Sequence, residues 1–173
     1  MSSKEESKQK ISISAKKLVA GWPKVGYDKS DPRVFDFYRK MSGTVTDKKS
    51  LFRGKRLADV FIFAMALGKH AGIKKPYEKK NDRNDNIDIE YFATTPEYVW
   101  MLIAVAIEES NGDLNIFAEP KTKILDVCEQ YANYGIGLLM DMEASATTSD
   151  PYYGYEEKFS ELLKSKDDGM PNM

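Results

Sequence analysis

The sequence has only one cysteine and one histidine, and this scarcity excludes several kinds of site. Cys128 cannot form a disulfide within the chain, which is typical of proteins from a reducing compartment. Zinc sites built from Cys and His lack ligands here. A catalytic Cys–His pair needs hydrogen-bond contact, and Cys128 and His70 fall on different predicted helices. We therefore expect Cys128 to be a small core residue and His70 a basic residue near a helix C-terminus.

The chain also lacks a long hydrophobic run. Its longest, Tyr98–Ile107, has ten residues, whereas a membrane-spanning helix needs about 20. We predict that this run forms a core helix. The N-terminal MSSKEESKQK is polar and has no apolar segment of the kind found in secretory signals. Together with the single cysteine, these features predict a cytoplasmic protein without a membrane partner.

Motifs that bind phosphate or calcium are missing or incomplete. The GIG sequence at 135–137 has no third glycine, no following lysine and no preceding strand, so it does not match a phosphate-binding loop. Asp and Asn alternate from Asp82 to Asp88 as in an EF-hand loop, but the positions that need Gly and Glu hold Ile87 and Ala93. We predict no cofactor and no metal ion, and interpret this stretch as a solvated loop.

A faint nuclease-like pattern is also incomplete. Asp113 and the EPK sequence at 119–121 resemble the acidic residues of metal-dependent nucleases, whose carboxylates share a metal ion. The spacing is too short to place them on paired strands, and Pro120 favours a helix start. No other catalytic constellation is present in the sequence. We therefore expect a protein that is not an enzyme.

What the chain does have is a strong division of charge. Residues 1–83 carry 21 Lys/Arg and 9 Asp/Glu, a net of +12, and residues 84–173 carry 5 and 18, a net of −13. The sum is −1. A basic block of this size predicts an anionic partner, such as nucleic acid, an acidic membrane surface or an acidic protein. The alternative, which the sequence leaves open, is that the two halves of the chain lie against each other.

Apolar spacing predicts three main helices. The strongest covers 55–71, with apolar residues at helical spacing and a glycine C-cap at Gly72. A second begins at Thr95-Pro96-Glu97 and runs to about Ser110, and Pro120 opens a third that reaches about residue 140. We predict a mainly α fold, a compact bundle of four to six helices with at most one short strand or hairpin. Its central pair is 55–71 and 96–110, with 120–140 packed against them.

Shorter elements complete this prediction. Ile11–Trp22 has the spacing of a short helix, and Ile87–Phe92 allows a strand whose partner the sequence does not identify. Asp31-Pro32 reads as the start of a helix with an apolar stripe formed by Val34, Phe35, Tyr38 and Met41. Gly135 and Gly137 lie inside the third main helix and predict a close packing contact or a kink.

The domain organisation follows from these elements. We predict a disordered tail at 1–10 and a helical domain at 11–143. Residues 144–173 are expected to form a linker, a short helix at about 156–163 and a polar tail.

The densest basic segment, residues 48–83, is the best candidate for a binding site. It places basic residues at both ends of the helix 55–71 and in the following loop. Such an arrangement can contact phosphates, and Tyr77 in the loop could stack on a base. The candidate nucleic-acid-binding residues are Lys49, Arg53, Lys55, Arg56, Lys69, Lys74, Lys75, Lys79, Lys80 and Arg83.

Two stretches, FRGKRLADVFIFAMALGKHAGIKKP (52–76) and ILDVCEQYANYGIGLLMD (124–141), carry a family resemblance. The first holds an A-x-A-L-G helix and a basic G-x-[RK]-[RK]-P turn, and the second an [ED]-x-Y-A-N-x-G helix. With the helix between them, over roughly residues 49–141, they resemble the small accessory proteins encoded beside Dnd-type DNA phosphorothioation and restriction genes. The matching segments are Ala64–Gly68, Gly72–Pro76 and Glu129–Gly135.

The resemblance implies a setting in antiviral defence linked to restriction and modification of DNA, and it carries over no catalytic residue. We expect a non-catalytic accessory subunit that contacts DNA through its basic face and partner proteins through its acidic one. The alternative is a protein-only adaptor or inhibitor with no nucleic-acid contact. Opposite charges in the two halves also allow head-to-tail self-association.

Overall fold

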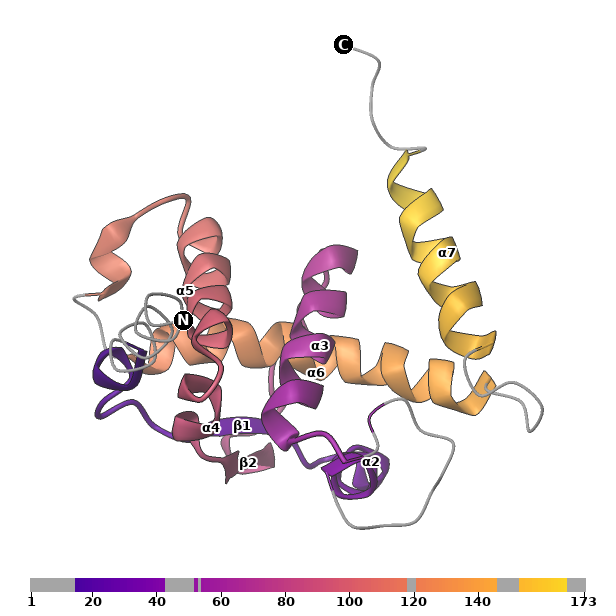
Figure 1. The fold of residues 1–173 in the computed structure, drawn as a ribbon, viewed down its shortest axis with the longest axis horizontal. Helices are drawn as coiled ribbons and strands as arrows, with labels where there is room; N and C mark the ends of the chain where they lie inside the picture. The colour runs from indigo at the N-terminus through magenta and orange to yellow at the C-terminus, as the bar shows by residue number, and fades with distance from the viewer. Residues whose placement is uncertain (1–14, 43–51, 53, 118–120, 146–152, 168–173) are drawn as a thin grey trace, which may run out of the picture.

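The computed structural model describes residues 15–42, 52, 54–117, 121–145 and 153–167, and it is mainly helical (Figure 1). A single helical turn at 15–18 comes first. This architecture confirms the predicted fold class. The elements that follow are β1 (Val25–Asp28), α2 (Pro32–Ser42), α3 (Leu57–Ala71), the 3-10 helix η1 (Lys80–Asp82), β2 (Arg83–Ile87), α4 (Ile89–Ala93), α5 (Pro96–Glu109), the 3-10 helix η2 (Leu114–Phe117), α6 (Thr122–Ser145) and α7 (Tyr153–Asp167).

The long helix α6 is the axis of the molecule. Figure 1 shows it running across the view, with α3 and α5 both standing against it. One side of α6 is lined with buried residues, among them Leu125, Ile136 and Leu139. Because α3, α5, α7 and β1 all contact α6, most of the hydrophobic core lies along this one helix.

The crossing of α3 and α6 is built on two glycines. A Cβ atom added to Gly68 would overlap the carbonyl oxygen of Tyr131, and one added to Gly135 would overlap the carbonyl oxygen of Ala64. The two backbones therefore touch at this point. The predicted close contact is confirmed at Gly135 and is wrong at Gly137, where an added Cβ would meet nothing within 4 Å.

The central helix pair differs from the prediction. The closest pair is α3 with α6, and α5 packs mainly on α6 rather than on α3. The pairing of 55–71 with 96–110 is therefore wrong. The reason is that Gly68 and Gly135 let the backbones of α3 and α6 touch, whereas an open groove lies between α3 and α5.

A two-stranded antiparallel sheet lies beside α6. β1 pairs with β2, with Val25 opposite Ile87 and Asp28 opposite Arg83, and an irregularity separates Val25 from Gly26. The predicted strand at 87–92 is wrong, because the strand ends at Ile87 and residues 89–93 form the helix α4. The strand is polar at all positions before Ile87, so it shows no apolar alternation.

Helix α2 starts where the sequence predicted. Pro32 is its first residue, and the Asp31 carboxylate accepts a hydrogen bond from the Arg33 backbone N–H at 2.9 Å. Val34 and Tyr38 are buried, but Phe35 is 41% exposed and Phe37 takes its place in the core. The expected core position of Phe35 is therefore wrong. The side chain of Met41 lies outside the described residues.

Of two helix ends predicted from the sequence, the C-terminus of α3 has the expected cap and the N-terminus of α5 does not. Gly72 ends α3 with φ of 70°, a left-handed conformation that glycine adopts at little cost, as predicted. Thr95 is the N-cap residue of α5, but its hydroxyl makes no capping hydrogen bond and instead accepts one from Arg56.

Helix α7 is longer than the predicted 156–163 and packs against α6. Its Tyr155 is 2% exposed and its ring lies edge-on to Phe52, while Phe159 meets Phe63 of α3. Among the described residues, no helix is both long and apolar enough to cross a membrane.

Candidate functional site

The ten predicted nucleic-acid-binding residues fall into three groups. Lys49 and Arg53 lie outside the described residues. Lys55, Lys79 and Lys80 are exposed, and their side chains form no ion pair with any described residue. The remaining five form ion pairs within the chain: Arg56, Lys69, Lys74, Lys75 and Arg83. Much of the basic segment is thus neutralised by the protein itself.

Arg56 connects the starts of α3 and α5. Its Nη2 lies 2.7 Å from Oδ1 of Asp59 and donates a hydrogen bond to the Thr95 hydroxyl at 2.9 Å. Its guanidinium also lies 5.9 Å from the ring centre of Tyr98, whose hydroxyl donates to Asp59. Burial raises the pKa of Asp59, but the hydrogen bonds from Arg56 and Tyr98 outweigh this effect and lower it. Arg56 therefore holds two helices together.

Arg83 binds the most deeply buried carboxylate of the described chain, that of Glu129 on α6. Glu129 is fully buried and accepts two hydrogen bonds from Arg83, Nε to Oε2 at 2.8 Å and Nη2 to Oε1 at 2.7 Å. The Gly26 backbone N–H and the Tyr77 hydroxyl also donate to it, at 2.7 and 3.0 Å. All four donors come from segments outside α6, so this carboxylate fixes β1, β2 and the 73–79 segment to the helix.

Tyr77 was expected to be available for stacking on a base. Its hydroxyl instead points inward to Glu129, and burial raises the pKa of this tyrosine. The ring is only partly exposed.

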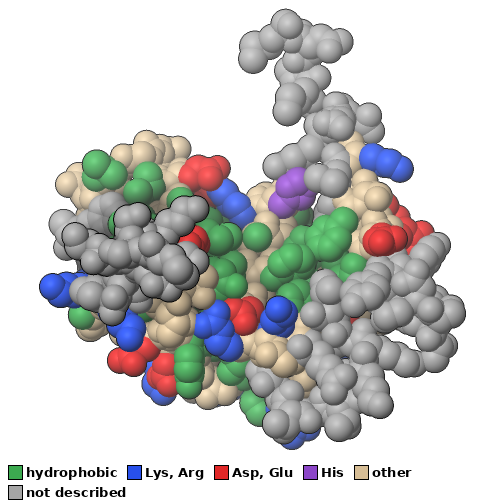
Figure 2. Space-filling view, in the orientation of Figure 1, with side chains coloured by type: hydrophobic (Ala, Val, Ile, Leu, Met, Phe, Trp, Pro, Cys, Tyr) green, Lys and Arg blue, Asp and Glu red, His purple; other side chains and the backbone are tan. Residues whose placement is uncertain are grey.

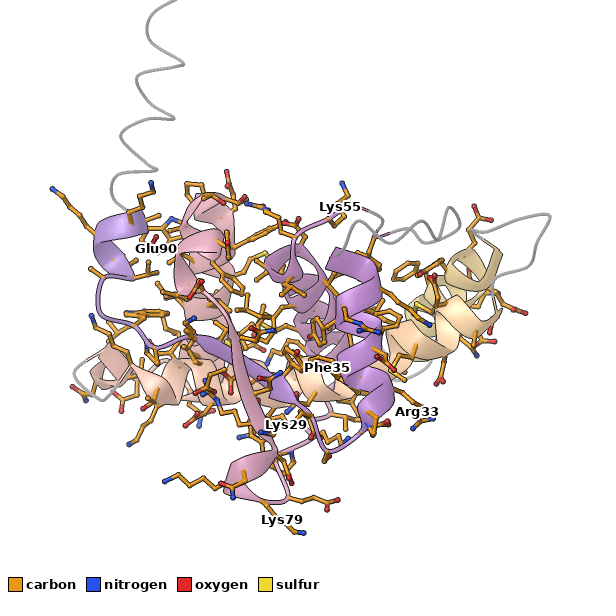
Figure 3. All side chains as sticks on the ribbon, turned by 90° about the horizontal axis from the view of Figure 1, so that it is seen from below. Lys29, Arg33, Phe35, Lys55, Lys79 and Glu90 are labelled. Atoms are coloured by element: carbon orange, nitrogen blue, oxygen red, sulfur yellow. The ribbon has the colours of Figure 1, made fainter. Side chains whose placement is uncertain are left out.

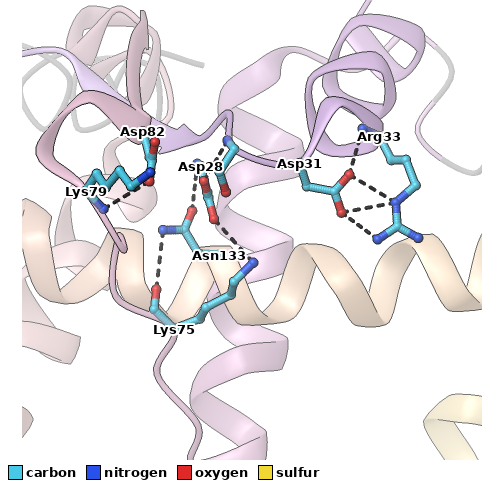
Figure 4. A network of polar contacts seen from close by, with 8 residues as sticks. Asp28, Asp31, Arg33, Lys75, Lys79, Asp82 and Asn133 are labelled. Atoms are coloured by element: carbon cyan, nitrogen blue, oxygen red, sulfur yellow. Dashed lines mark hydrogen bonds and ion pairs between the residues drawn. The ribbon is translucent and has the colours of Figure 1, made fainter.

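A second polar network lies one turn further along α6 (Figure 4). The Asn133 side chain accepts a hydrogen bond from the Asp28 backbone N–H at 3.0 Å and donates one to the Lys75 carbonyl at 3.4 Å. The Asp28 carboxylate lies 3.2 Å from Nζ of Lys75 and accepts a hydrogen bond from the Ser30 N–H. These contacts hold the end of β1 and the segment after α3 on the same face of α6.

A third cluster joins the C-terminal ends of α3 and α5. Glu109 of α5 receives hydrogen bonds from Lys69 at 2.7 Å, from Lys74 at 2.8 Å and from the Tyr131 hydroxyl at 2.5 Å. These donors lower the pKa of Glu109 to about 2, Lys69 contributing most. Lys69 also lies 3.0 Å from Glu108. Two predicted phosphate-binding lysines are thus engaged by one carboxylate of the acidic half.

Cys128 and His70 have the surroundings that the sequence predicted. Cys128 is fully buried, its Sγ donates to the Leu102 carbonyl at 3.4 Å, and burial raises the pKa of its thiol. His70 lies in the last turn of α3. The described residues contain no group of three or more His, Cys, Asp and Glu placed to hold a metal ion.

An open groove of about 800 Å³ separates α3 from α5. Its walls are Met65 and Ala66 of α3 and Met101, Ala104 and Val105 of α5, and the Lys69–Glu109–Tyr131 cluster closes one end. Figure 2 shows hydrophobic side chains between the two helices, with acidic and basic ones together at the upper end.

This groove is the feature that sequence reasoning missed. Tyr98–Ile107 was expected to be a core helix, and its Val99, Leu102, Ile103 and Ala106 are indeed buried. However, Trp100 is 51% exposed and Met101 is 36% exposed. The sequence did carry a signal for it: α5 is apolar on every face, and contact with a single helix cannot bury all of that apolar surface.

Two of the exposed lysines, Lys79 and Lys80, form a separate surface with Lys29 at the open end of the sheet, whereas Lys55 lies on the opposite side of the view in Figure 3. Figure 3 shows Lys29 and Lys79 on the lower side of that view, where a backbone hydrogen bond from Lys29 to Asp82 holds the two segments together. Lys80 follows directly in η1. Lys29 was not among the predicted binding residues, because it lies outside the dense segment 48–83.

The described chain is thus a small helical protein whose buried charges are saturated by its own donors. Its exposed features include an apolar groove between α3 and α5 and a group of lysines beside the sheet. The family of DNA sulphur modification system-associated protein 4 matches residues 36–153, and the chain belongs to this family. The predicted resemblance to Dnd accessory proteins is confirmed. No curated protein matches the chain, and no solved structure does.

Proposed function

We propose that this protein is a non-catalytic accessory subunit of a DNA sulphur modification system and that it works by binding a protein of that system. The observation that supports this role best is the exposed apolar face of α5, with Trp100 at 51% and Met101 at 36% exposure. Contiguous exposed apolar surface on a small protein commonly marks an interaction site. The family match supplies the setting.

The state of the buried acids supports the non-catalytic part of the proposal. A general base or metal ligand needs an oxygen lone pair that a substrate or ion can reach. Glu129 is fully buried and accepts four hydrogen bonds, and Glu109 accepts three from Lys69, Lys74 and Tyr131. Both carboxylates stabilise the fold: Glu129 is out of reach of a substrate, and both oxygens of Glu109 already bond to side chains of the chain itself.

Co-purification tests the proposed role. The tagged full chain would be co-expressed with each product of the adjacent sulphur modification and restriction genes, and complexes isolated at two salt concentrations. We expect one of these products to co-purify in a fixed ratio. Failure of every product to bind, with the chain folded, would exclude the role.

DNA contact is the second candidate function, and the exposed lysines support it. Lys29, Lys55, Lys79 and Lys80 form no ion pair with any described residue, so their charges are available to phosphates. Acidic side chains lie close by, since Glu78 and Asp82 belong to the same loop. DNA binding measured at several salt concentrations tests this function, and undetectable affinity at about 50 mM salt would exclude it.

A further inference from the structure

One carboxylate of α5 lies at the centre of donors that belong to other parts of the fold. Nζ of Lys69 donates to Oε1 of Glu109 at 2.7 Å, and Nζ of Lys74 donates to Oε2 at 2.8 Å. The Tyr131 hydroxyl donates to Oε1 at 2.5 Å. These donors come from α3, from the segment after α3 and from α6, whereas Glu109 is the last residue of α5. Two ammonium groups and a hydroxyl that converge in this way form a site for an anion.

The crossing of α3 and α6 places two of these donors without any help from α5. Gly68, directly before Lys69, is so close to Tyr131 that an added Cβ atom would overlap the Tyr131 carbonyl oxygen. Nζ of Lys69 lies 5.2 Å from the centre of the Tyr131 ring. The backbone contact between the two helices therefore keeps this ammonium group and this hydroxyl side by side.

The segment that carries Lys74 is fastened on both sides of that residue. The Ile73 N–H donates to the Gly68 carbonyl of α3 at 3.2 Å, and the Lys75 N–H donates to the Gln130 carbonyl of α6 at 2.9 Å. Binding groups that are already ordered before a ligand arrives lose less entropy when it binds. The donor cluster is thus preorganised by α3 and α6 alone.

The acids of α5 stand at the end of the helix where its dipole opposes them. Glu108 and Glu109 are the last two residues of α5, and its last turn has no basic residue. The C-terminal end of a helix carries partial negative charge, which favours cations there. Lys69, 3.0 Å from Glu108 and 2.7 Å from Glu109, offsets this repulsion. Contact with the donor cluster, and not the stability of α5, accounts for acids at this position.

The open groove between α3 and α5 gives access to the cluster. Lys69, Glu109 and Tyr131 line the groove together with His70, and the side chain of Lys74 is 43% exposed. Figure 2 shows acidic and basic side chains together at this end of the groove. Ion pairs join the two helices here, and ion pairs at partly exposed positions are weak. A ligand in the groove therefore reaches the donors and competes with the carboxylate for them.

We propose that Lys69, Lys74 and Tyr131 form a phosphate-binding site that Glu109 keeps closed in the free protein. The carboxylate takes the place of the phosphate, because it accepts hydrogen bonds from all three donors. A phosphate group offers at least as much negative charge and as many acceptor oxygens, and lysine is a common phosphate ligand. It binds when the end of α5 moves away from α3. The inference goes beyond the accessory role and does not depend on it.

Removing the Glu109 carboxylate tests the site. Glu109→Ala vacates the donors, and inorganic phosphate is titrated into the full chain at constant ionic strength and followed by ³¹P NMR and calorimetry. We expect E109A to bind phosphate at least tenfold more tightly than the wild type. The matched control, Glu108→Ala, removes the same charge from a carboxylate that pairs with Lys69 and not with Lys74, and it should gain less than twofold. Equal gains in E109A and E108A, or no gain in either, would overturn the inference.

Further variants show whether the gain depends on the named donors. In the E109A background, Lys74→Gln and Tyr131→Phe should each lower the gained affinity at least threefold, whereas Lys79→Gln on the sheet surface should not. A gain that survives K74Q and Y131F would place the anion elsewhere and contradict the site. Circular dichroism verifies the fold of each variant. If an alanine variant loses the wild-type spectrum, Glu109→Gln and Glu108→Gln, which keep the side-chain size, repeat the comparison with the same criterion.

A short DNA duplex serves as the second probe and identifies the source of the phosphate. Tighter binding of both probes by E109A supports the site and assigns it to a backbone phosphate of nucleic acid. Tighter binding of inorganic phosphate alone supports the site and assigns it to a small phosphate ligand. Tighter binding of the duplex alone, equal in E109A and E108A, would reflect only the lost negative charge and would overturn the inference. The co-purification test of the accessory role uses the wild type and is independent of these outcomes.

Discussion

The guanidinium of Arg83 binds the fully buried carboxylate of Glu129 through two parallel hydrogen bonds, although 46 residues separate them. Arg83 is the last residue of the basic half of the chain, and Glu129 lies in the acidic half. Some basic residues of the first half of the sequence are thus paired with acidic residues of the second half inside the fold. Ion pairs between Glu109 and the lysines Lys69 and Lys74 repeat the pattern.

Replacing Arg83 should lower the free energy of unfolding far more than replacing a cation at the surface. Arg83→Met leaves the Glu129 carboxylate buried with only Gly26 and Tyr77 as donors, and breaking a buried pair in this way typically costs about 3–5 kcal/mol. The double variant R83M/E129Q should recover part of this loss, because the buried charge is gone. Urea unfolding measures both. The control Lys79→Met, at an exposed position, should stay within about 0.5 kcal/mol of wild type, and equal losses in R83M and K79M would refute the assignment.

Replacing Gly135 and Gly137 of α6 with alanine should change the stability of the protein in opposite directions. Gly135→Ala forces a methyl group into the Ala64 carbonyl, and we expect a loss of about 3 kcal/mol or more, since backbone atoms cannot yield as side chains do. Gly137→Ala meets nothing within 4 Å and should stabilise the helix by about 0.5–1 kcal/mol. Thermal unfolding of the two variants side by side checks both signs. A destabilised G137A or an unaffected G135A would contradict the observed crossing.

Acid should weaken the contact between α3 and α5. The pKa of Glu109 is about 2, below its ordinary value of 4.5, so its ion pairs stabilise the fold above pH 4.5 and are lost as the pH falls toward 2. Solvent screening limits the contribution to about 1 kcal/mol. The free energy of unfolding at pH 7, 4.5 and 3 should therefore fall more steeply for wild type than for Glu109→Gln. Parallel curves for the two proteins would show that Glu109 is not stabilised by its neighbours.

If the protein binds DNA, its exposed lysines should carry the salt dependence. Replacing both Lys79 and Lys80 with Gln should reduce the slope of log affinity against log salt by about 1 for each phosphate contact removed. Lys74→Gln should leave the slope nearly unchanged, because that lysine is paired with Glu109. Mobility-shift or anisotropy titrations at several salt concentrations measure the slopes. The opposite ranking would place the DNA on the face around Glu109 instead.

The main helices could be predicted because their signals are local. The spacing of apolar residues in α3, the proline that opens α5 and the left-handed Gly72 each act within a few residues of the chain. The strand β2 has no such signal, since the polar residues Asn84 and Asp85 are held by pairing with β1 almost 60 residues earlier. Which main helices touch was likewise set by Gly68 and Gly135 together, and neither glycine alone specifies its partner.

The candidate site was harder to predict for a related reason. A sequence gives the sign of each charge but not the distance between charges, so Lys69 and Lys74 looked as available as Lys79. Glu129 looked like one more surface acid on α6, because its donors Gly26, Tyr77 and Arg83 come from three separate segments. The exposed face of α5 could have been suspected from its uniform apolar composition, but the groove depends on how α3 crosses α6.

The contact between Gly26 and Glu129 determines where this protein can be truncated. The family match begins at residue 36, after β1, and ends at residue 153, before Tyr155. A fragment cut at these limits would remove the Gly26 donor, the strand that pairs with β2 and a buried tyrosine on α7. Such a fragment should be poorly soluble when expressed alone. The boundaries suitable for biochemical work are wider than those by which the family is recognised.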